Sequence, residues 1–233
     1  MTIWFASGNL HKKKELGDIL FAAMPGNSFE LKIPSEAGLE FDPDETGNTF
    51  RDNALIKAEA LYRLLEERND AGQIVRRRGD PVIADDSGIC VDALNGRPGI
   101  YSARYCGSET NISKDLSQSR KDAEGRCIKL DAAERNALLL SELGDNPRRD
   151  ARFVCSMVLY FSPDRFYIAQ ETLEGELVKN SGSARGKGGF GYDPILYLPD
   201  LGRTVAELSD EEKNLRSHRG KAARAIAKIL FSL

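Results

Sequence analysis

The segment TIWFASGNLHKKKELGDIL, residues 2–20, sets the fold class because its hydrophobic pattern changes at Ser7. Residues 2–6 form a short, almost continuous apolar run, which is typical of a buried strand. In residues 10–20 the apolar side chains are separated by polar ones, which is typical of one face of a helix. The chain therefore opens with a predicted strand, turn and helix.

The same interleaving of strand and helix patterns continues to the end of the chain. Strand patterns recur in four further segments: 81–85, 89–94, 152–162 and 165–178. A weaker alternation covers 28–41. Helix patterns are found at 49–65, after a capping box at 209–212, and from about 218. This order predicts an α/β fold with a mixed β-sheet, in one domain that covers residues 1–233.

Composition excludes several classes of function. The formal net charge is only −3, whereas a domain that binds nucleic acid usually has a basic excess. No window approaches the 18 apolar residues of a membrane span, and the apolar start precedes its basic run, the reverse of a signal peptide. We expect a cytoplasmic protein.

The cysteines agree with that location. They are far apart and form no C-x-x-C, and only two histidines are present, so a Cys/His zinc site is not expected. We expect reduced thiols at all four positions: Cys90, Cys106, Cys127 and Cys155.

The glycine-rich segment GKGGFGYDP, residues 186–194, contains a formal G-x-G-x-x-G and nearly spells a P-loop. A dinucleotide site needs a helix directly after the glycines, and Pro194 disfavours one. The P-loop pattern is one residue short and has Gly188 where Ser or Thr would bind magnesium. What remains is a loop that presents Phe190, either to stack on a flat base or as part of a structural turn.

Two basic clusters could bind an anion. Ser7-Gly8-Asn9 precedes a predicted helix, where N–H groups favour anions, and Lys12 lies one turn further on. A solvated helix face is the alternative. The second cluster joins Lys213 to Ser217-His218-Arg219-Gly220 at the junction of two predicted helices.

Acidic residues provide candidate metal ligands. Asp44 and Glu45 precede the predicted helix at 49–65, although acids at such a position are also ordinary dipole partners. Asp85 and Asp86 are adjacent at the end of a predicted strand, so their side chains point to opposite faces and only one can serve a given site. Oxygen ligands of this kind suit Mg²⁺.

In this order, the segments resemble the inosine/xanthosine triphosphate pyrophosphatase family. The resemblance spans nearly the whole chain and rests on five segments: SGNLHKKKE, ETGNTFRDNALIKA, ADDSGICVDALNGRPGIYSARY, GKGGFGYDP and EEKNLRSHRG. It implies an elongated mixed α/β fold with two lobes around a central nucleotide-binding cleft. It also implies hydrolysis of non-standard purine nucleoside triphosphates to the monophosphate and pyrophosphate, with Mg²⁺, by a homodimer.

The resemblance implies a role for each matching residue. Asp86 is the expected general base and metal ligand, with Asp44 or Glu45 as further ligands. The triphosphate would be held by Ser7, Gly8, Asn9, Lys12, Lys57 and Lys213. The base would be bound by Phe190, Tyr192, Asp193, His218 and Arg219. Asn53, Ser87 and Gly191 complete the predicted substrate-binding set.

Arg219 carries the prediction for specificity. Donors aimed at the 6-oxo group of hypoxanthine or xanthine would be left unpaired against adenine, and such sites can discriminate by about 10⁴–10⁵. The sequence does not show how GTP is excluded.

The chain departs from the family pattern at two kinds of position. Asp44-Glu45 stands where the family often has two glutamates, which leaves open which of them meets the metal. The polar segments 68–80 and 107–128 look longer than usual, and we expect surface insertions there, with exposed arginines in the first.

Other classes of protein remain as alternatives. A catalytically silent nucleotide sensor would keep the pocket without turnover, but it would not need the carboxylate of Asp86. An unrelated nucleotide hydrolase is disfavoured because no Nudix-like glutamate helix is present. A nucleic-acid repair protein is disfavoured by the acidic balance.

Overall fold

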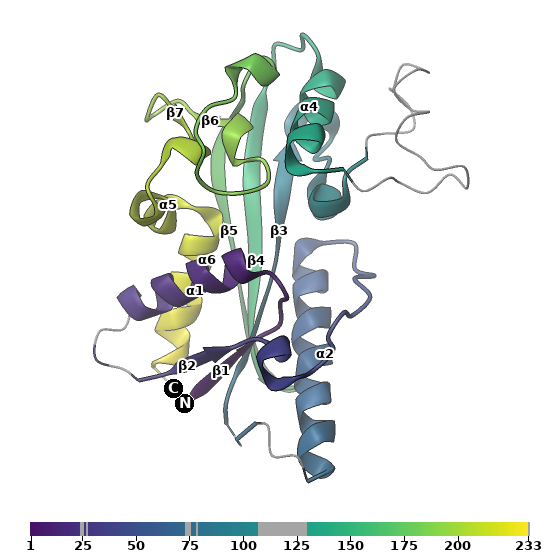
Figure 1. Cartoon of the computed structure of the whole chain (residues 1–233), viewed down its shortest axis with the longest axis vertical. Coiled ribbons are helices and arrows are strands. Elements are labelled where there is room, and N and C mark those ends of the chain that lie inside the picture. The colour runs from purple at the N-terminus through teal and green to yellow at the C-terminus, as the bar shows by residue number, and fades with distance from the viewer. Residues whose placement is uncertain (24–25, 27, 73–75, 78, 107–129, 233) are drawn as a thin grey trace, which may run out of the picture. The chain divides into compact units, whose positions relative to one another are not determined.

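The computed structural model describes residues 1–23, 26, 28–72, 76–77, 79–106 and 130–232. These residues form a seven-stranded sheet in the order β2-β1-β3-β4-β5-β6-β7. β1 pairs in parallel with β2 and β3, whereas β6 pairs antiparallel with β5 and β7. The predicted α/β class with a mixed sheet is confirmed (Figure 1).

The chain divides into two compact units. The first consists of Met1–Ser87, Val154–Thr172 and Asn214–Leu233, and the second of Gly88–Phe153 and Leu173–Lys213. The three longest strands contribute to both units: β3 (Val82–Val91), β4 (Asp150–Ser162) and β5 (Arg165–Leu177).

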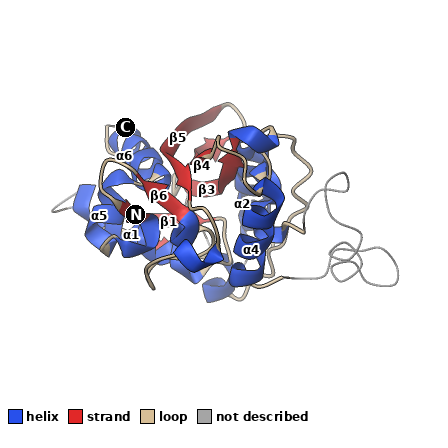
Figure 2. Ribbon diagram, turned by 90° about the horizontal axis from the view of Figure 1, so that it is seen from above, coloured by secondary structure: helices blue, strands red, loops and turns tan. Residues whose placement is uncertain are grey.

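The first unit also contains the short strands β1 (Thr2–Phe5) and β2 (Glu30–Lys32). Helices α1 (Leu10–Ala23) and α6 (His218–Leu230) cover one face of its strands. Helix α2 (Phe50–Asp70) covers the other face, as Figure 2 shows. The predicted strand, turn and helix at the start of the chain are confirmed.

Alternation along the strands sorts the core of this unit into two layers. Ile3, Phe5 and Ile83 pack with α1 and α6, whereas Trp4 and Ala84 pack with α2. Successive side chains of a strand point to opposite faces. The same alternation therefore carries on into the polar residues of β3 that follow.

The second unit packs its own core around the remaining parts of the three long strands. It adds β6 (Leu196–Leu198), β7 (Arg203–Thr204) and helix α4 (Ala132–Leu143). Helix α5 (Asp210–Arg216) begins in this unit, after the predicted capping box of Ser209 and Glu212. No sequence prediction covered α4, although Asp131 and Glu134 form a capping box at its start.

The strands predicted at 81–85 and 89–94 are parts of one continuous strand, β3, which ends at Val91. Asp92–Leu94 form a 3₁₀ turn instead. The gap predicted between the two segments was therefore wrong. A Cβ at Gly88 would lie 2.3 Å from the Ser102 Oγ and 2.5 Å from the Gly99 carbonyl oxygen. The glycine therefore permits close approach of the 99–102 backbone within a regular strand.

The expectation of an exposed loop with solvated arginines at 68–80 was wrong in part. Helix α2 continues to Asp70, and Arg76 is only 6% exposed. Its guanidinium donates to Glu66 and to the Asp80 carbonyl oxygen, and it lies 4.7 Å from the centroid of the Tyr62 ring. The predicted insertion at 107–128 lies outside the described residues.

The cysteines only partly fit the sequence prediction. Cys90 and Cys155 are free thiols, but Cys106 is disulfide-bonded, so the expectation of a reduced thiol was wrong there. Within the described part of the chain, no helix has both the length and the apolar character needed to cross a membrane.

Candidate functional site

The turn before α1 is stabilised from within. The Ser7 Oγ accepts a hydrogen bond from the Asn9 backbone N–H at 3.1 Å. The Asn9 Oδ1 accepts from the backbone N–H groups of His11 at 3.0 Å and Lys12 at 3.2 Å. Asn9 thus occupies two of the first-turn donors that the sequence assigned to an anion, and the phosphate role of this turn stays a prediction.

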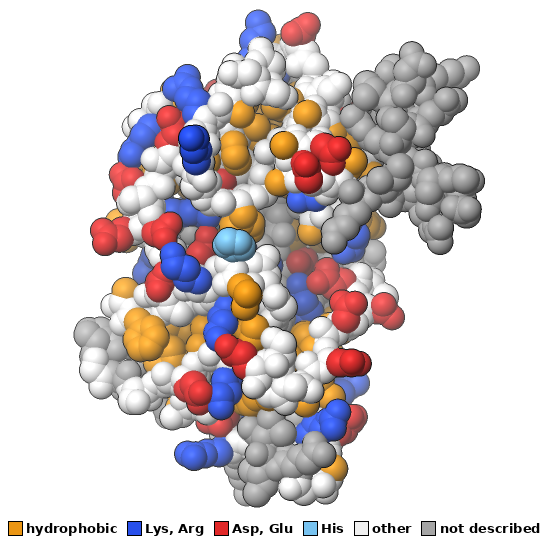
Figure 3. All heavy atoms as spheres, in the orientation of Figure 1, with side chains coloured by type: hydrophobic (Ala, Val, Ile, Leu, Met, Phe, Trp, Pro, Cys, Tyr) orange, Lys and Arg blue, Asp and Glu red, His pale blue; other side chains and the backbone are white. Residues whose placement is uncertain are grey.

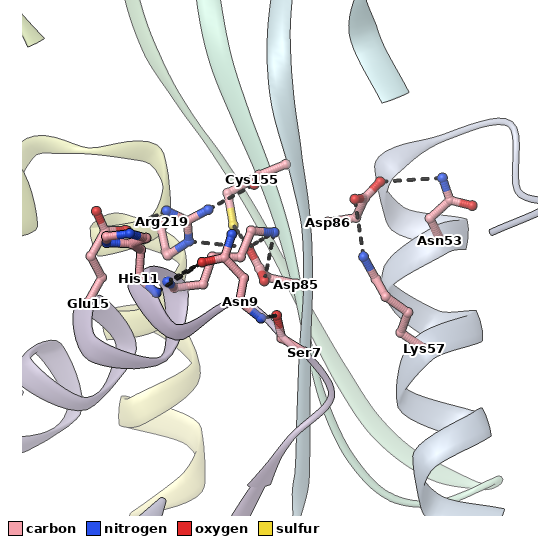
Figure 4. A network of polar contacts seen from close by, with 12 residues as sticks. Ser7, Asn9, His11, Glu15, Asn53, Lys57, Asp85, Asp86, Cys155 and Arg219 are labelled. Atoms are coloured by element: carbon pink, nitrogen blue, oxygen red, sulfur yellow. Dashed lines mark hydrogen bonds and ion pairs between the residues drawn. The ribbon is translucent and has the colours of Figure 1, made fainter. Parts of the chain in front are cut away.

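Asp85 is the centre of a buried ionic network on the α1 and α6 face of β3 (Figure 4). Its carboxylate accepts from the Lys12 Nζ at 3.1 Å and from the Arg219 Nε at 3.2 Å. Arg219 also donates to Glu15 and, at 2.9 Å, to the Ser87 Oγ. The sequence did not assign a role to Asp85, although strand alternation, applied from Ile83, would have placed it on this face.

The charge of Asp85 is strongly favoured. Burial by itself would raise its pKa, but the ammonium of Lys12 and the guanidinium of Arg219 lower the pKa well below its usual value. Cys155, whose Sγ lies 3.9 Å from the Asp85 carboxylate, has its pKa raised to about 12 by burial and by that charge. At neutral pH, Asp85 is therefore an anion beside a neutral thiol.

Asp86 faces α2, on the opposite side of the strand (Figure 4). It accepts from the Lys57 Nζ at 3.2 Å and from the Asn53 Nδ2 at 3.4 Å. Asn53 and Lys57 are four residues apart and so share one helix face. The prediction that the side chains of Asp85 and Asp86 point to opposite faces is confirmed.

The pKa of Asp86 is shifted in the opposite direction from that of Asp85. Burial raises it, and the nearby charges of Glu45 and Asp85 add to this effect, against the opposing effect of Lys57 and Lys12. Lys57 itself has a raised pKa, because the carboxylates around it outweigh its burial. The result is a carboxylate with a higher proton affinity than usual beside a firmly charged ammonium, a pair suited to acid–base chemistry.

A divalent cation would find oxygen ligands at this face. The Glu45 carboxylate is 3.0 Å from the Lys57 Nζ, so it shares that ammonium with Asp86, whereas Asp44 is exposed. No three His, Cys, Asp or Glu side chains form a ligand cluster among the described residues. Two carboxylates nevertheless fit Mg²⁺, which is commonly bound by one or two of them plus water and substrate phosphates.

The glycine loop in the second unit is held by Asp193. The Asp193 Oδ2 accepts from the Phe190 backbone N–H at 2.8 Å and from the Lys213 Nζ at 2.9 Å. The Lys213 Nζ also lies 4.7 Å from the centroid of the Phe190 ring. Gly189 has φ +71°, and a Cβ there would be 2.0 Å from the Asp193 Oδ2, so only glycine fits.

The residues after this loop form a short 3₁₀ turn, Asp193–Ile195, and then β6. No α-helix directly follows the glycines, so the dinucleotide pattern lacks the helix that it requires. Tyr192 belongs to the core of its unit, and its hydroxyl donates to the Ser102 carbonyl oxygen at 2.8 Å. These contacts give Tyr192 an internal role.

A cavity of about 360 Å³ lies along the glycine loop within the second unit. Its walls come from the first turns of α4 and from the loop, including Asn136, Lys187 and Phe190. Because α4 was not predicted, no sequence pattern pointed to Asn136.

The start of α6 contains the last predicted residues. The Ser217 Oγ caps the helix by accepting from the Gly220 N–H at 3.0 Å, and His218 is buried. Arg219 is 2% exposed, with its guanidinium directed at Asp85, Glu15 and Ser87. Its predicted role at the base edge stays a prediction, and the structure gives it a role within the ionic network.

The predicted site residues thus form two groups. The first unit contains Ser7, Gly8, Asn9, Lys12, Asp44, Glu45, Asn53, Lys57, Asp86, Ser87, His218 and Arg219. The second unit contains Phe190, Gly191, Tyr192, Asp193 and Lys213.

The chain is similar to known proteins along nearly its whole length. Residues 3–229 match the model of the Ham1 family. The chain is 42% identical to a dITP/XTP pyrophosphatase of Treponema denticola over 99% of this chain and 98% of the relative. A dITP/XTP pyrophosphatase of Pectobacterium atrosepticum is 39% identical over 97% of this chain and 95% of its own length.

Solved structures support the fold. The Ham1 protein of Staphylococcus aureus is 34% identical, with a TM-score of 0.72 over 100% of this chain and 99% of its own. A HAM1 protein from Coxiella burnetii is 32% identical, with a TM-score of 0.73 over the full length of both chains.

Proposed function

The chain belongs to the Ham1 family, and from this premise we propose that it hydrolyses ITP, dITP and XTP to the monophosphate and pyrophosphate. It is a pyrophosphatase of non-standard purine nucleoside triphosphates, which it removes from the nucleotide pool. The observation that carries the mechanism is the buried Asp86, with its raised pKa, beside Lys57 and Glu45.

In the proposed reaction, Asp86 orients a water molecule and accepts its proton. The water oxygen forms a bond to the α-phosphorus. The bond between the α-phosphorus and the oxygen that bridges it to the β-phosphorus breaks, and pyrophosphate leaves with that oxygen. A positioned general base contributes roughly 10²–10⁴-fold to such a step. The ammonium groups of Lys57 and Lys12 stabilise the negative charge that develops on the phosphates.

We assign the metal to Glu45 and Asp86 and propose that it is Mg²⁺. When bound, it would supply positive charge to the phosphate oxygens. The exposed position of Asp44 favours Glu45 over Asp44 as the second ligand.

The glycine loop is assigned to the base. Phe190 is presented between Gly189 and Gly191, and stacking on an aromatic side chain is available to any purine. Asp193 and Lys213 hold the loop in place, as the bonds at 2.8 and 2.9 Å indicate.

The remaining parts of the proposal concern the whole protein. Lys and Arg side chains are interspersed with Asp and Glu side chains on the face in Figure 3, which suits a protein of small-molecule substrates. We propose a cytoplasmic homodimer that binds no nucleic acid and no membrane.

The test is pyrophosphate release from ITP, dITP, XTP, GTP and ATP, with Mg²⁺ and with EDTA. Asp86→Asn is expected to reduce metal-dependent release from ITP and XTP by about 10²–10⁴-fold. Asp164→Asn, in the exposed turn between β4 and β5, is the matched control and should retain full activity.

Two outcomes would contradict the proposal. Release that survives in Asp86→Asn would remove Asp86 as the base. Tight binding of ITP by the wild type without any release, measured by calorimetry, would favour a nucleotide sensor instead.

A further inference from the structure

Asn136 is a buried polar residue in the first turns of α4, and the proposed chemistry makes no use of it. It is 9% exposed and lies in the wall of the cavity along the glycine loop. Its Nδ2 donates to the Gly191 carbonyl oxygen at 3.1 Å. Because a carbonyl oxygen can only accept, this bond fixes which end of the amide faces the loop.

The other end of the same amide is a cost to the folded state. No described residue donates a hydrogen bond to the Asn136 Oδ1, although the atom is buried. An unpaired buried acceptor is unfavourable, and a leucine of similar size would avoid it in the wall of a cavity that Ala132 and Ile195 also line. Packing of α4 therefore does not account for the amide, whereas the bond to Gly191 does.

That bond acts on the backbone next to Phe190. The Phe190 N–H is held by Asp193, and the carbonyl of the following residue is held by Asn136. Gly191 has φ +66°, a conformation open to glycine at little cost, so without an anchor its peptide group could rotate. Phe190 is thus fixed on both sides, from Asp193 and from α4.

We propose that Asn136 is a positioning residue for base recognition: it holds the Gly191 carbonyl and so sets the orientation of the Phe190 ring. The proposal rests on the proposed function of the loop as the base site. Asn136 acts through Phe190 and takes no part in the chemical step at Asp86.

The first test compares Asn136→Leu with wild type in steady-state kinetics with XTP. KM is expected to rise about five- to tenfold, the usual worth of one hydrogen bond, while kcat stays within about twofold. The melting temperature is expected to stay the same or rise, because the unpaired acceptor is removed. Ala137→Leu, on the exposed side of the same helix, is the control and should change neither constant.

Asn136→Asp provides a second variant of the same shape. Its carboxylate lacks the donor while ionised and regains one when protonated. The ratio of the KM of Asn136→Asp to the KM of wild type, measured at each pH, is therefore expected to fall towards one as the pH is lowered. A ratio that does not change with pH would contradict the role of the Nδ2 donor.

A double-mutant cycle shows whether Asn136 acts through Phe190. If it does, the double variant Asn136→Leu/Phe190→Ala has the same KM as Phe190→Ala alone. Independent, multiplicative increases in KM would overturn the proposal. A fall in melting temperature with an equal loss of kcat would also overturn it, since that would indicate a structural role only.

Hydrogen exchange without nucleotide separates this proposal from the proposed function. Asn136→Leu is expected to speed exchange at the amides of residues 189–192, whichever substrate the protein uses. Unchanged exchange there would overturn the role of Asn136. Absence of pyrophosphate release by the wild type would overturn only the proposed function.

Discussion

At the scale of single residues, two adjacent aspartates have pKa values that are shifted in opposite directions. Asp85 and Asp86 differ by one position on β3, yet the pKa of the first is lowered and that of the second is raised. Burial acts to raise the pKa of both. The pleat of the strand gives Asp85 two cations that outweigh its burial, whereas it leaves Asp86 with Lys57 and the nearby carboxylate of Glu45. The chemistry of each aspartate is set by the face on which it lies.

The same geometry yields a prediction for the metal. Glu45→Gln is expected to raise the Mg²⁺ concentration needed for half-maximal activity at least tenfold, because it removes a charged oxygen near Asp86. Asp44→Asn, at the exposed neighbouring position, is the matched control and should leave that concentration within about twofold. The measurement is a magnesium titration of pyrophosphate release, and equal effects of the two variants would contradict the assignment.

At the scale of elements, β3 shows how far the sequence could predict the site. Alternation along the strand required the side chains of Asp85 and Asp86 to point to opposite faces. This prediction needed only local geometry. The continuity of β3 through Gly88 could not be predicted, because it depends on how close the 99–102 backbone lies, and that is a tertiary contact.

Other elements were missed for related reasons. The polar start of α4 directly follows the long polar segment, and the role of Asn136 depends on a loop 55 residues away in the chain. Arg76 was expected in solvent because no local pattern reveals that Tyr62, Glu66 and the Asp80 carbonyl surround it. Sequence patterns indicate the faces of elements, whereas the partners of buried polar groups come from the tertiary fold.

Asp85 also links elements, since it joins β3 to α1 through Lys12 and to α6 through Arg219. Asp85→Asn should lower the free energy of unfolding at pH 7 by about 3–5 kcal/mol, because the buried cations lose their counter-charge. The pKa of Asp85 is near 3.8 in the unfolded chain and lies below that value in the folded protein. Its contribution is therefore present above about pH 4 and is lost as the pH falls further.

The measurement is urea unfolding of both proteins from pH 7 down to pH 3. The difference in the free energy of unfolding between wild type and Asp85→Asn should become smaller below about pH 4. Asp164→Asn is the control for an exposed aspartate and should show a small gap throughout. A large gap that stays constant down to pH 3 would contradict the assigned role of Asp85.

At the scale of the whole molecule, each unit has its own core and its own group of predicted site residues. The first unit contains Glu45, Asp86, Lys12 and Lys57, and the second contains the glycine loop with Asp193 and Lys213. The order of the sequence patterns correctly indicated the fold class, because strand and helix patterns interleave along the chain. The division into two units follows from contacts between distant segments, which no local pattern reports.

The proposed homodimer is tested at this scale. Light scattering coupled to size-exclusion chromatography is expected to give about twice the chain mass of 25.7 kDa across a range of loading concentrations. A mass equal to one chain at every concentration would contradict the proposal. Full activity of a protein with the mass of one chain would show that the reaction does not require a dimer.

If the glycine loop binds the base, as proposed, its bracing has a consequence for how a nucleotide arrives. The ring of Phe190 is carried by a backbone that Asp193 and Asn136 already hold, so docking of a base orders little that was not ordered before. Most of the entropy of arranging this platform is lost when the chain folds, not when each substrate molecule binds. Successive nucleotides then meet a surface of constant shape, and selection among them falls to the atoms at the edge of the base.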